Sequence, residues 1–179
     1  MRPTRDEYHL RAAENAASMA TCIRRSVGCV LTNARGHQLS SGYNGVESGA
    51  PHCNQVHEIA MGRIIQYQDK LEIKGELTYP YACEGASSPS GTNLEGCDAI
   101  HAEQNALLQC PDVFRIHTCY VTHSPCIHCV KLLLGTSCQR VVFREKYSHD
   151  EPARLKWLKS KYNLENVARE WIHLPRTSR

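Results

Sequence analysis

The amino-acid sequence predicts a single α/β domain built on a mixed sheet with helices on both faces. Three observations lead to this prediction: an N-terminal helical pattern, a hairpin pattern directly after it, and a C-terminal half in which strand-like and helical segments alternate. Strands joined through a helix run parallel, whereas the two strands of a hairpin run antiparallel, so the sheet should be mixed. The 179 residues suit one domain with a genuine core.

The opening elements are a helix, a hairpin and an insertion. Residues 6–20 carry apolar side chains at helical spacing in an alanine-rich setting, which predicts an amphipathic helix. Residues 27–31 and 38–43 are short β-prone runs separated by turn-forming residues, which predicts a hairpin. A loop-rich insertion follows at about residues 46–97. Within it we expect one helical piece, at residues 56–68.

The second half of the chain alternates between helices and strands. Asp98 is expected to cap a helix that runs to about Gln109 and stops before Pro111. Pro125 opens a later helix that ends at Gly135. After the helix that Asp98 caps, the expected elements in chain order are a strand at 118–122, the helix that Pro125 opens, at 126–134, a strand at 140–143, a helix at 152–162 and a strand at 167–174.

Composition and charge argue against several classes of partner. No uninterrupted apolar stretch approaches the roughly 20 residues that a membrane span needs. The net charge is +3, and acidic and basic residues are mixed along the chain rather than gathered in blocks. A protein that grips a long phosphate backbone usually shows clustered Lys and Arg. We therefore expect neither a membrane nor a nucleic acid as partner.

The chain has ten cysteines, and the cellular compartment decides whether such cysteines form disulfides. Residues 1–10 carry charges and lack the apolar core of a signal peptide, so we expect the chain to stay in a reducing cytoplasm. Cysteines there are metal ligands, nucleophiles or buried thiols rather than disulfides. Four of them fall on apolar faces of strands or at helix ends, and we interpret these as buried thiols: Cys29, Cys110, Cys119 and Cys138.

Two short motifs at predicted helix starts carry the chemistry. His101 and Glu103 lie two residues apart at one start, and Cys126 and Cys129 lie three apart at the other. Cysteines at this spacing share one face of a helix, where the helix dipole favours their thiolate form. If both helices begin at the same sheet edge, the edge where α/β folds place their ligands, His101 supplies a third ligand to the same metal ion.

One imidazole and two thiolates leave the fourth tetrahedral position of a zinc ion open, which is the arrangement of a catalytic site. Zinc in such a site lowers the pKa of bound water from about 16 to near 7. Glu103 is close enough to carry protons there without ligating the metal. This histidine, glutamate and paired-cysteine pattern is typical of nucleobase deaminases. We therefore predict a hydrolytic deaminase with Glu103 as its catalytic residue.

The same residues allow a structural interpretation. Cys126 and Cys129 can form half of a four-cysteine structural zinc site, with His101 and Glu103 merely opening a helix. The two motifs flank a predicted strand in the order that the chemistry requires, which favours the catalytic interpretation. His128 faces the other side of its helix, and we interpret it as a bystander.

Four segments carry a resemblance to a known family: TCIRRSVG at residues 21–28, GYNG at 42–45, HAEQNA at 101–106 and YVTHSPC at 120–126. With them the chain resembles the deoxycytidylate deaminases, including bacteriophage and late-competence bacterial members, over nearly its whole length. The zinc motif is common to the whole superfamily. The GYNG segment separates this family from the tRNA adenosine and free-cytidine deaminases.

The resemblance implies a cytidine deaminase-like fold, a three-layer α/β/α sandwich with a five-stranded mixed sheet, in one domain over residues 1–179. It implies conversion of dCMP and water to dUMP and ammonia, which supplies thymidylate synthesis, in the cytoplasm or, for a viral protein, in the host cytoplasm. Family members are commonly hexamers, activated by dCTP with magnesium and inhibited by dTTP. The GYNG loop is associated with this regulatory nucleotide, so Tyr43 and Gly45 are the expected allosteric contacts.

The substrate contacts are expected beside the zinc site. Asn44 is either a sugar hydroxyl contact or a turn residue next to Gly45. Tyr147 either covers the base or is an ordinary surface or core tyrosine, and Ser124 is a further expected contact. A nucleoside monophosphate also needs a cation or a backbone nest for its phosphate. The sequence does not choose among the phosphate candidates, which are Arg24, Arg25, Lys146, His149 and Arg154.

The resemblance also raises a second zinc site. Several phage and bacterial relatives carry one, and the matching positions here are Cys22, Cys53, Cys83 and Cys97. A closed four-cysteine site would be structural and would tie the long insertion to the domain. The segment at residues 78–96 varies in length and ligand type among relatives, which leaves His52 and His57 as substitute ligands.

Other functions stay open at this point. One is a zinc-stabilised nucleotide-sensing module without catalysis, although such a module has no use for Glu103 beside an open metal position. The nearer alternatives are a deaminase of tRNA, which the modest charge disfavours, or of a 5-substituted dCMP. The sequence does not show which group is tolerated at the pyrimidine C5.

Overall fold

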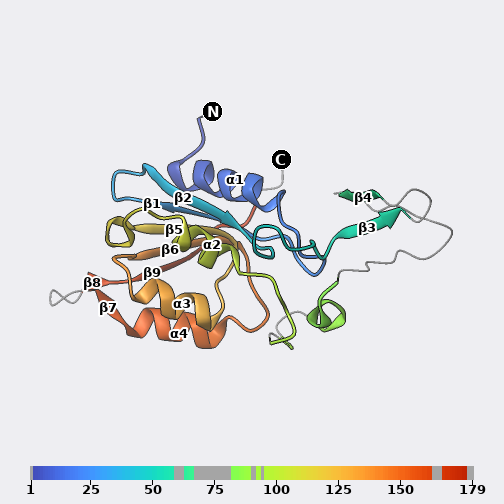
Figure 1. Ribbon diagram of the computed structural model, residues 1–179. Coiled ribbons are helices and arrows are strands. Elements are labelled where there is room, and N and C mark those ends of the chain that lie inside the picture. The colour runs from blue at the N-terminus through green and yellow to red at the C-terminus, as the bar shows by residue number, and fades with distance from the viewer. Residues whose placement is uncertain are drawn as a thin grey trace.

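The computed structural model describes residues 2–58, 63–66, 82–89, 92–93, 95–162 and 167–176. Its centre is a five-stranded sheet (Figure 1). The strands, in spatial order, are β2 (Gln38–Tyr43), β1 (Gly28–Thr32), β5 (Thr118–His123), β6 (Arg140–Glu145) and β9 (Glu170–His173).

The sheet is mixed, as the alternation of hairpin and helical connections predicts. β1 is antiparallel to both β2 and β5, with Cys29 opposite Val121. β5, β6 and β9 run parallel to one another. The three parallel strands therefore bring their carboxyl ends to one edge, and Cys126 follows the carboxyl end of β5 by three residues.

Helices cover both faces of the sheet, which confirms the three-layer sandwich. α1 (Arg5–Ala17) packs on the face that carries Val30, Tyr120 and Val142. The opposite face is covered by α2 (Ala102–Leu108), α3 (Ile127–Leu134) and α4 (Glu151–Lys159). Neighbouring strand residues point to opposite faces, so Leu31, Val121 and Phe143 enter the second core, where Trp157 of α4 is fully buried.

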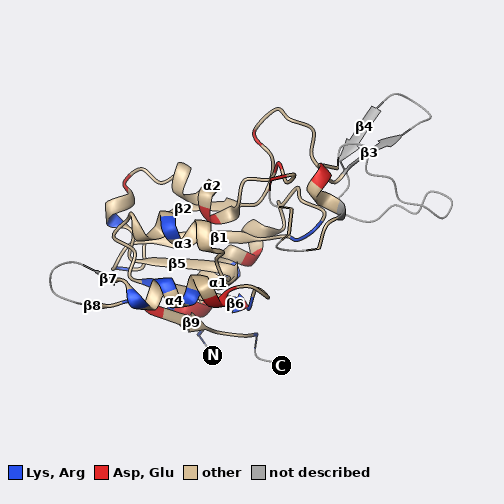
Figure 2. Cartoon of the chain, turned by 90° about the horizontal axis from the view of Figure 1, so that it is seen from below, with Lys and Arg blue, Asp and Glu red and all other residues tan. Residues whose placement is uncertain are grey.

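Figure 2 shows Lys and Arg gathered along α4, while Asp and Glu lie on several other elements. The basic residues of that helix are Arg154, Lys156 and Lys159, and Arg154 is paired with Glu151 on the same helix. No helix in the described part of the chain is both long enough and apolar enough to cross a membrane.

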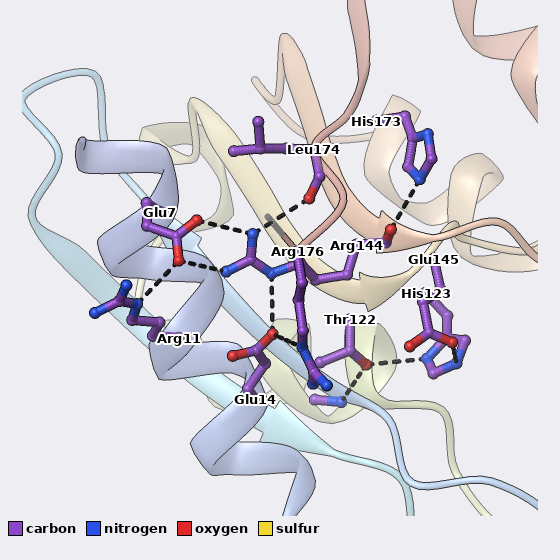
Figure 3. Close-up of polar contacts among 11 residues, drawn as sticks. Glu7, Arg11, Glu14, Thr122, His123, Arg144, Glu145, His173, Leu174 and Arg176 are labelled. Atoms are coloured by element: carbon purple, nitrogen blue, oxygen red, sulfur yellow. Dashed lines mark hydrogen bonds and ion pairs between the residues drawn. The ribbon is translucent and has the colours of Figure 1, made fainter. Parts of the chain in front are cut away.

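Arg144, at the end of β6, joins α1 and the C-terminal segment to the sheet (Figure 3). Its guanidinium group is only 3% exposed and donates to both carboxylate oxygens of Glu7, at 2.8 and 2.9 Å. It also donates to Glu14 at 2.9 Å and to the carbonyl oxygen of Leu174 at 3.2 Å. One buried guanidinium therefore links two carboxylates of α1 and the C-terminal segment to β6.

Arg144→Met is expected to lower the free energy of unfolding by about 3 kcal/mol, because it leaves Glu7 and Glu14 without their buried partner. Arg11→Met is the matched control, since Arg11 is an exposed partner of the same Glu7 and its loss should cost under about 1 kcal/mol. Urea unfolding of both variants measures the difference. Equal losses would contradict the role given to Arg144.

The same pair predicts a pH dependence. Hydrogen bonds from Arg144 lower the pKa of Glu7 from 4.5 to about 2. The stabilisation from a carboxyl with a depressed pKa is complete above the unfolded pKa and is lost as the pH falls through the folded one. The stability gap between the wild type and Arg144→Met should therefore narrow as the pH falls from 4.5 toward about 2.

The helix expected at residues 56–68 is wrong. Two antiparallel strands occupy the described part of this segment, β3 (Gln55–Glu58) and β4 (Arg63–Gln66), and residues 59–62 and 67–68 lie outside the described residues. Val56, Ile64 and Ile65 are β-branched, and such residues favour strands over helices. In Figure 1 the pair stands apart from the sandwich.

The predicted start of α2 is also wrong, because its N-cap is His101 rather than Asp98. Residues just before it are held in an extended bridge, in which Ile100 exchanges two backbone hydrogen bonds with Gly45. The side chain of Gln104 accepts a hydrogen bond from the backbone N–H of His101 at 2.9 Å. This reciprocal capping box fixes His101 at the helix start.

The last helix and strand are shorter than predicted. α4 ends at Lys159, and the next residues form β7 (Lys161–Tyr162), which pairs with β8 (Val167–Ala168). The strand expected at 167–174 is thus divided into β8 and β9. Two short 3-10 helices complete the described elements, η1 (Glu84–Ser87) and η2 (Val113–Arg115).

Candidate active site

Three side chains from two helix starts converge at the carboxyl edge of the sheet. His101 is the N-cap of α2, Cys126 is the N-cap of α3, and Cys129 lies in the first turn of α3. His101 Nδ1 lies 3.5 Å from Cys126 Sγ and 3.3 Å from Cys129 Sγ. Within the described residues, this is the one group of three or more potential ligands whose donor atoms all lie within 4.8 Å of one another.

The donor set fits zinc. Hydrogen bonds with Cys129 and His101 lower the pKa of the Cys126 thiol to about 3, which favours the thiolate form that a metal ion binds. The hydrogen bond between Cys129 and Cys126, and then burial, raise the pKa of Cys129. One nitrogen and two sulfur donors at this spacing suit a soft divalent cation.

Glu103 lies in the first turn of α2 and is 4% exposed. Burial raises the pKa of its carboxyl, and the carboxyl contacts the thiol of Cys129. The group is therefore held beside the three donors without belonging to their cluster. A buried carboxyl with a raised pKa is suited to accept and release protons near neutral pH.

A pocket of about 120 Å³ opens beside these groups. His101, Glu103 and Cys126 line it, and so do most of the residues predicted to touch substrate. The other lining residues that enter the argument are Cys22, Arg24, Arg25, Asn44, Cys97, His123, Ser124 and Tyr147. Three of the phosphate candidates do not line it: Lys146, His149 and Arg154.

The structure distinguishes the two neighbouring arginines. Arg24 donates to the carbonyl oxygens of Pro89 and Thr92, at 2.6 and 3.1 Å, and so holds the end of the insertion. The guanidinium of Arg25 lies over the ring of Tyr147, 5.4 Å from its centroid. Its buried Nη1 has no hydrogen-bond partner among the described residues. A cation in the pocket with an unused donor is suited to an anionic ligand.

Asn44 and Ser124 hold the walls of the pocket. The Asn44 side chain accepts from the N–H of Val27 and donates to the carbonyl oxygen of Arg25, both at 2.7 Å. Ser124 Oγ accepts the N–H of Tyr147 at 2.7 Å, which leaves the hydroxyl proton of Ser124 to donate elsewhere. Asn44 thus fixes the backbone around Arg25, and Ser124 fixes the turn that presents Tyr147.

The GYNG segment has a packing reason in the structure. A Cβ at Gly42 would lie 2.4 Å from the backbone of Ala102 and Ala106, so this glycine lets β2 pack closely against α2. A Cβ at Gly45 would meet Thr21 Oγ1 at 2.5 Å. Tyr43 and Gly45, the predicted allosteric contacts, do not line the pocket, and Tyr43 is 38% exposed.

The four cysteines of the predicted second site lie in one neighbourhood. Burial, together with the nearby thiols of Cys83 and Cys22, raises the pKa of Cys53 to about 11. Burial also raises the pKa of Cys97, and the charges of Cys22 and Cys83 act in the same direction. The described side chains do not bring three of these sulfurs within the 4.8 Å seen in the first cluster. The side chain of the substitute ligand His57 lies outside the described residues.

Most of the remaining thiols are core residues. Cys29 and Cys119 are fully buried with their sulfurs 3.6 Å apart, and Cys138 is also fully buried. Cys110 is only half-buried, and its thiol donates to the carbonyl oxygen of Asp112. The structure therefore places three of the four in the core, as predicted, and one at its margin.

His123 is a pocket residue that the sequence reasoning missed. It closes β5, lines the pocket and contacts Glu145 at 3.1 Å. The available signal was its position at the end of a predicted strand, directly before Ser124 in the YVTHSPC segment.

Comparison with known proteins identifies the family of the chain. Residues 3–145 match the family model described as the cytidine and deoxycytidylate deaminase zinc-binding region. The chain belongs to this deaminase family. A deoxycytidylate deaminase of Mycobacterium phage D29 is 34% identical over 143 residues, which cover 79% of this chain and 95% of the phage protein.

Within the family, two yeast deoxycytidylate deaminases are longer. Those of Saccharomyces cerevisiae and Schizosaccharomyces pombe are 28% and 32% identical, over 84% and 83% of this chain. The chain spans about two fifths of their length, 41% and 39%. The dCMP deaminase of cyanophage S-TIM5, solved with dCMP and dUMP, superimposes with a TM-score of 0.59 at 22% identity, over 97% of this chain and 99% of that one. This likeness confirms the cytidine deaminase-like fold.

Proposed function

We propose that the protein catalyses the zinc-dependent hydrolysis of dCMP to dUMP and ammonia. The observation that carries the proposal is the convergence of His101 Nδ1 with the sulfurs of Cys126 and Cys129, beside a buried glutamate and a pocket. When bound by these three residues, zinc supplies an open coordination position and activates water as a nucleophile. The names of the relatives, which act on deoxycytidylate, support this substrate.

Glu103 carries the protons of the reaction. Its carboxylate accepts a proton from the attacking water and donates it to N3 of the pyrimidine as C4 is attacked. It then accepts the remaining proton of the new C4 hydroxyl and transfers it to the amino group, which leaves as ammonia. Burial supports this role because a raised pKa lets the carboxyl hold the proton between the two transfers.

The remaining pocket residues position the nucleotide. The Nη1 of Arg25, which has no partner among the described residues, binds the 5′-phosphate. The ring of Tyr147, which lies under the Arg25 guanidinium, covers the ligand. Asn44 keeps one amide proton and one lone pair beyond its two backbone bonds, which suffice for a sugar hydroxyl. Ser124 offers its hydroxyl proton from the other wall.

Arg25→Met is expected to raise KM for dCMP by about 10- to 100-fold, the effect of losing one charge-assisted hydrogen bond. The rate with deoxycytidine, which has no phosphate, should change little. Arg35→Met serves as the control, because Arg35 lies exposed in the turn between β1 and β2. Steady-state assays of ammonia release with both substrates measure the effect. An equal loss with deoxycytidine would show that Arg25 does not bind phosphate.

The finer features of the proposal rest on the family resemblance. We propose that the enzyme supplies dUMP for thymidylate synthesis in the cytoplasm, works as a homohexamer, and is activated by dCTP with magnesium and inhibited by dTTP. Tyr43 and Gly45 are the proposed nucleotide contacts of this regulation. Assays with and without each effector, and light scattering in solution, test these features directly.

A second, structural zinc held by Cys22, Cys53, Cys83 and Cys97 belongs to the same proposal, supported by the mutual proximity of these thiols. Metal analysis should then give about two zinc ions per chain. Cys83→Ser should remove one of them and leave the other, since Cys83 does not line the active-site pocket. A single zinc in the wild type would remove this second site.

A substrate panel separates the proposal from its alternatives. Ammonia release is measured from dCMP, dCTP, deoxycytidine, cytosine-containing tRNA, and 5-methyl and 5-hydroxymethyl dCMP. Preference for dCMP supports the proposal. Preference for tRNA or for a 5-substituted dCMP would contradict dCMP as the substrate and identify the alternative. Tight dCMP binding without any ammonia release would instead identify a catalytically silent nucleotide sensor.

A further inference from the structure

The ring of His123 separates two hollows of the molecule. On one side it lines the active-site pocket together with Arg25 and Ser124. On the other it lines a cleft between the end of α1 and the C-terminal segment, where Glu14 and Arg176 lie. A titratable side chain in the wall between two such hollows responds to charge that arrives on either side.

Both ring nitrogens already have partners (Figure 3). Nε2 lies 3.1 Å from a carboxylate oxygen of Glu145, and Nδ1 lies 3.2 Å from the hydroxyl of Thr122. The same hydroxyl oxygen accepts the backbone N–H of Gly28 at 3.2 Å. A hydroxyl can donate to the neutral ring or accept from the charged ring, so protonation of His123 requires no repacking.

The charges around the ring keep it neutral in the free protein. Burial lowers the pKa of His123, and the charge of Arg25 lowers it further, while Glu145 acts in the opposite direction. Charged and titratable groups line both hollows with His123: Arg24, Arg25, His101 and Glu103 on the pocket side, and Glu14, Arg144, Glu145 and Arg176 on the cleft side. Of these, Glu14 is already paired with Arg144 and Arg176, whereas the buried Nη1 of Arg25 has no partner among the described residues.

We propose that His123 determines specificity for a phosphorylated substrate by charge: it takes up a proton when a nucleoside monophosphate binds beside Arg25, and the charged ring then favours the nucleotide over the nucleoside. This inference rests on the proposed function, in which the pocket binds a nucleoside 5′-monophosphate. Nδ1–H then donates to Thr122, and Nε2–H keeps its bond to Glu145. The ring acts through its charge and needs no direct contact with the phosphate.

The negative charge of the phosphate explains why His123 takes up a proton when the nucleotide binds. A bound phosphate dianion compensates the positive charge of Arg25, which opposes protonation of His123 in the free protein. Glu145 then remains as the counterion behind the ring, 61% exposed. Deoxycytidine and deoxyuridine fill the base and sugar positions without supplying this charge.

Isothermal titration calorimetry of the zinc-loaded protein tests the inference without turnover. The probes are dUMP, the unreactive product, and deoxyuridine, each titrated at about pH 7.5, where a phosphate monoester with a second pKa near 6 is already a dianion. Two buffers with different ionisation enthalpies give the number of protons taken up. The variants are His123→Gln and Glu145→Gln, and His37→Gln is the control because His37 is exposed in the turn after β1.

The wild type and the His37→Gln control should take up protons with dUMP and not with deoxyuridine. His123→Gln should abolish the uptake and weaken dUMP binding by at least about twofold at this pH, the proton-linkage effect of a one-unit rise in the pKa of His123, with deoxyuridine binding unchanged. Glu145→Gln, which keeps the imidazole and alters only an exposed carboxylate, should reduce the uptake.

Four results would overturn the inference. Proton uptake that persists in His123→Gln would show that another group takes up the proton. Equal weakening of dUMP binding and deoxyuridine binding would give His123 a structural role alone. Tight dUMP binding and dCMP turnover without proton uptake defeat this inference and leave the proposed function standing. Absence of dUMP binding in every protein defeats both.

Discussion

Glu103→Gln should lower kcat for dCMP deamination by about 10³-fold while zinc content and dUMP affinity stay within about twofold of the wild type. The amide keeps the size and most hydrogen bonds of the carboxyl, so α2 and its capping box persist. It cannot accept the proton of the attacking water, and it cannot return one to the ring nitrogen. The loss therefore falls on the chemical step rather than on binding.

Three measurements together decide this prediction: steady-state ammonia release, zinc content by emission spectroscopy, and dUMP titration. Glu47→Gln is the matched control, since Glu47 is exposed and does not line the pocket. If Glu103→Gln kept a rate close to that of the wild type, another group would have to carry the protons. A variant that lost its zinc would point instead to a structural role for Glu103.

Cys129→Ser is expected to remove the catalytic zinc and reduce activity below detection. A hydroxyl is a harder donor than a thiolate and does not ionise near neutral pH, so the remaining imidazole and thiolate hold zinc weakly. The melting temperature should also fall, because metal that binds only the folded state stabilises it.

Metal content and thermal unfolding, each with and without a chelator, measure this loss. Cys110→Ser is the control, since its thiol is half-buried and bonds only to a nearby carbonyl oxygen. The chelator should lower the melting temperature of the wild type toward that of Cys129→Ser. A Cys129→Ser protein that kept both its zinc and its activity would remove Cys129 from the proposed ligand set.

The sheet and the ligand cluster could be predicted because short-range patterns determine them. Two cysteines three apart at a helix start share a face whatever the rest of the chain does. His101 joins them because α2 and α3 begin at the same sheet edge, which the order of strands and helices already implies. The alternation of apolar residues gave the strands for the same local reason.

What could not be predicted depends on contacts between distant segments. Arg24 and Arg25 are adjacent arginines that the sequence does not distinguish. In the structure, Arg24 donates its hydrogen bonds to the carbonyl oxygens of Pro89 and Thr92, far away in the chain. Asp98 looked like a helix cap because a bridge between Ile100 and Gly45, 55 residues away in the chain, cannot be read from local sequence. The role of His123 depends in the same way on Glu145, from another strand.

The central claim is the binding of one zinc ion by His101, Cys126 and Cys129. Anomalous diffraction at the zinc edge from crystals of the purified enzyme tests it most directly. The account predicts a peak about 2.3 Å from both sulfurs and about 2.1 Å from His101 Nδ1, with solvent or ligand as the fourth neighbour. A peak with a fourth protein side chain bound, or no peak at these three residues, would contradict it.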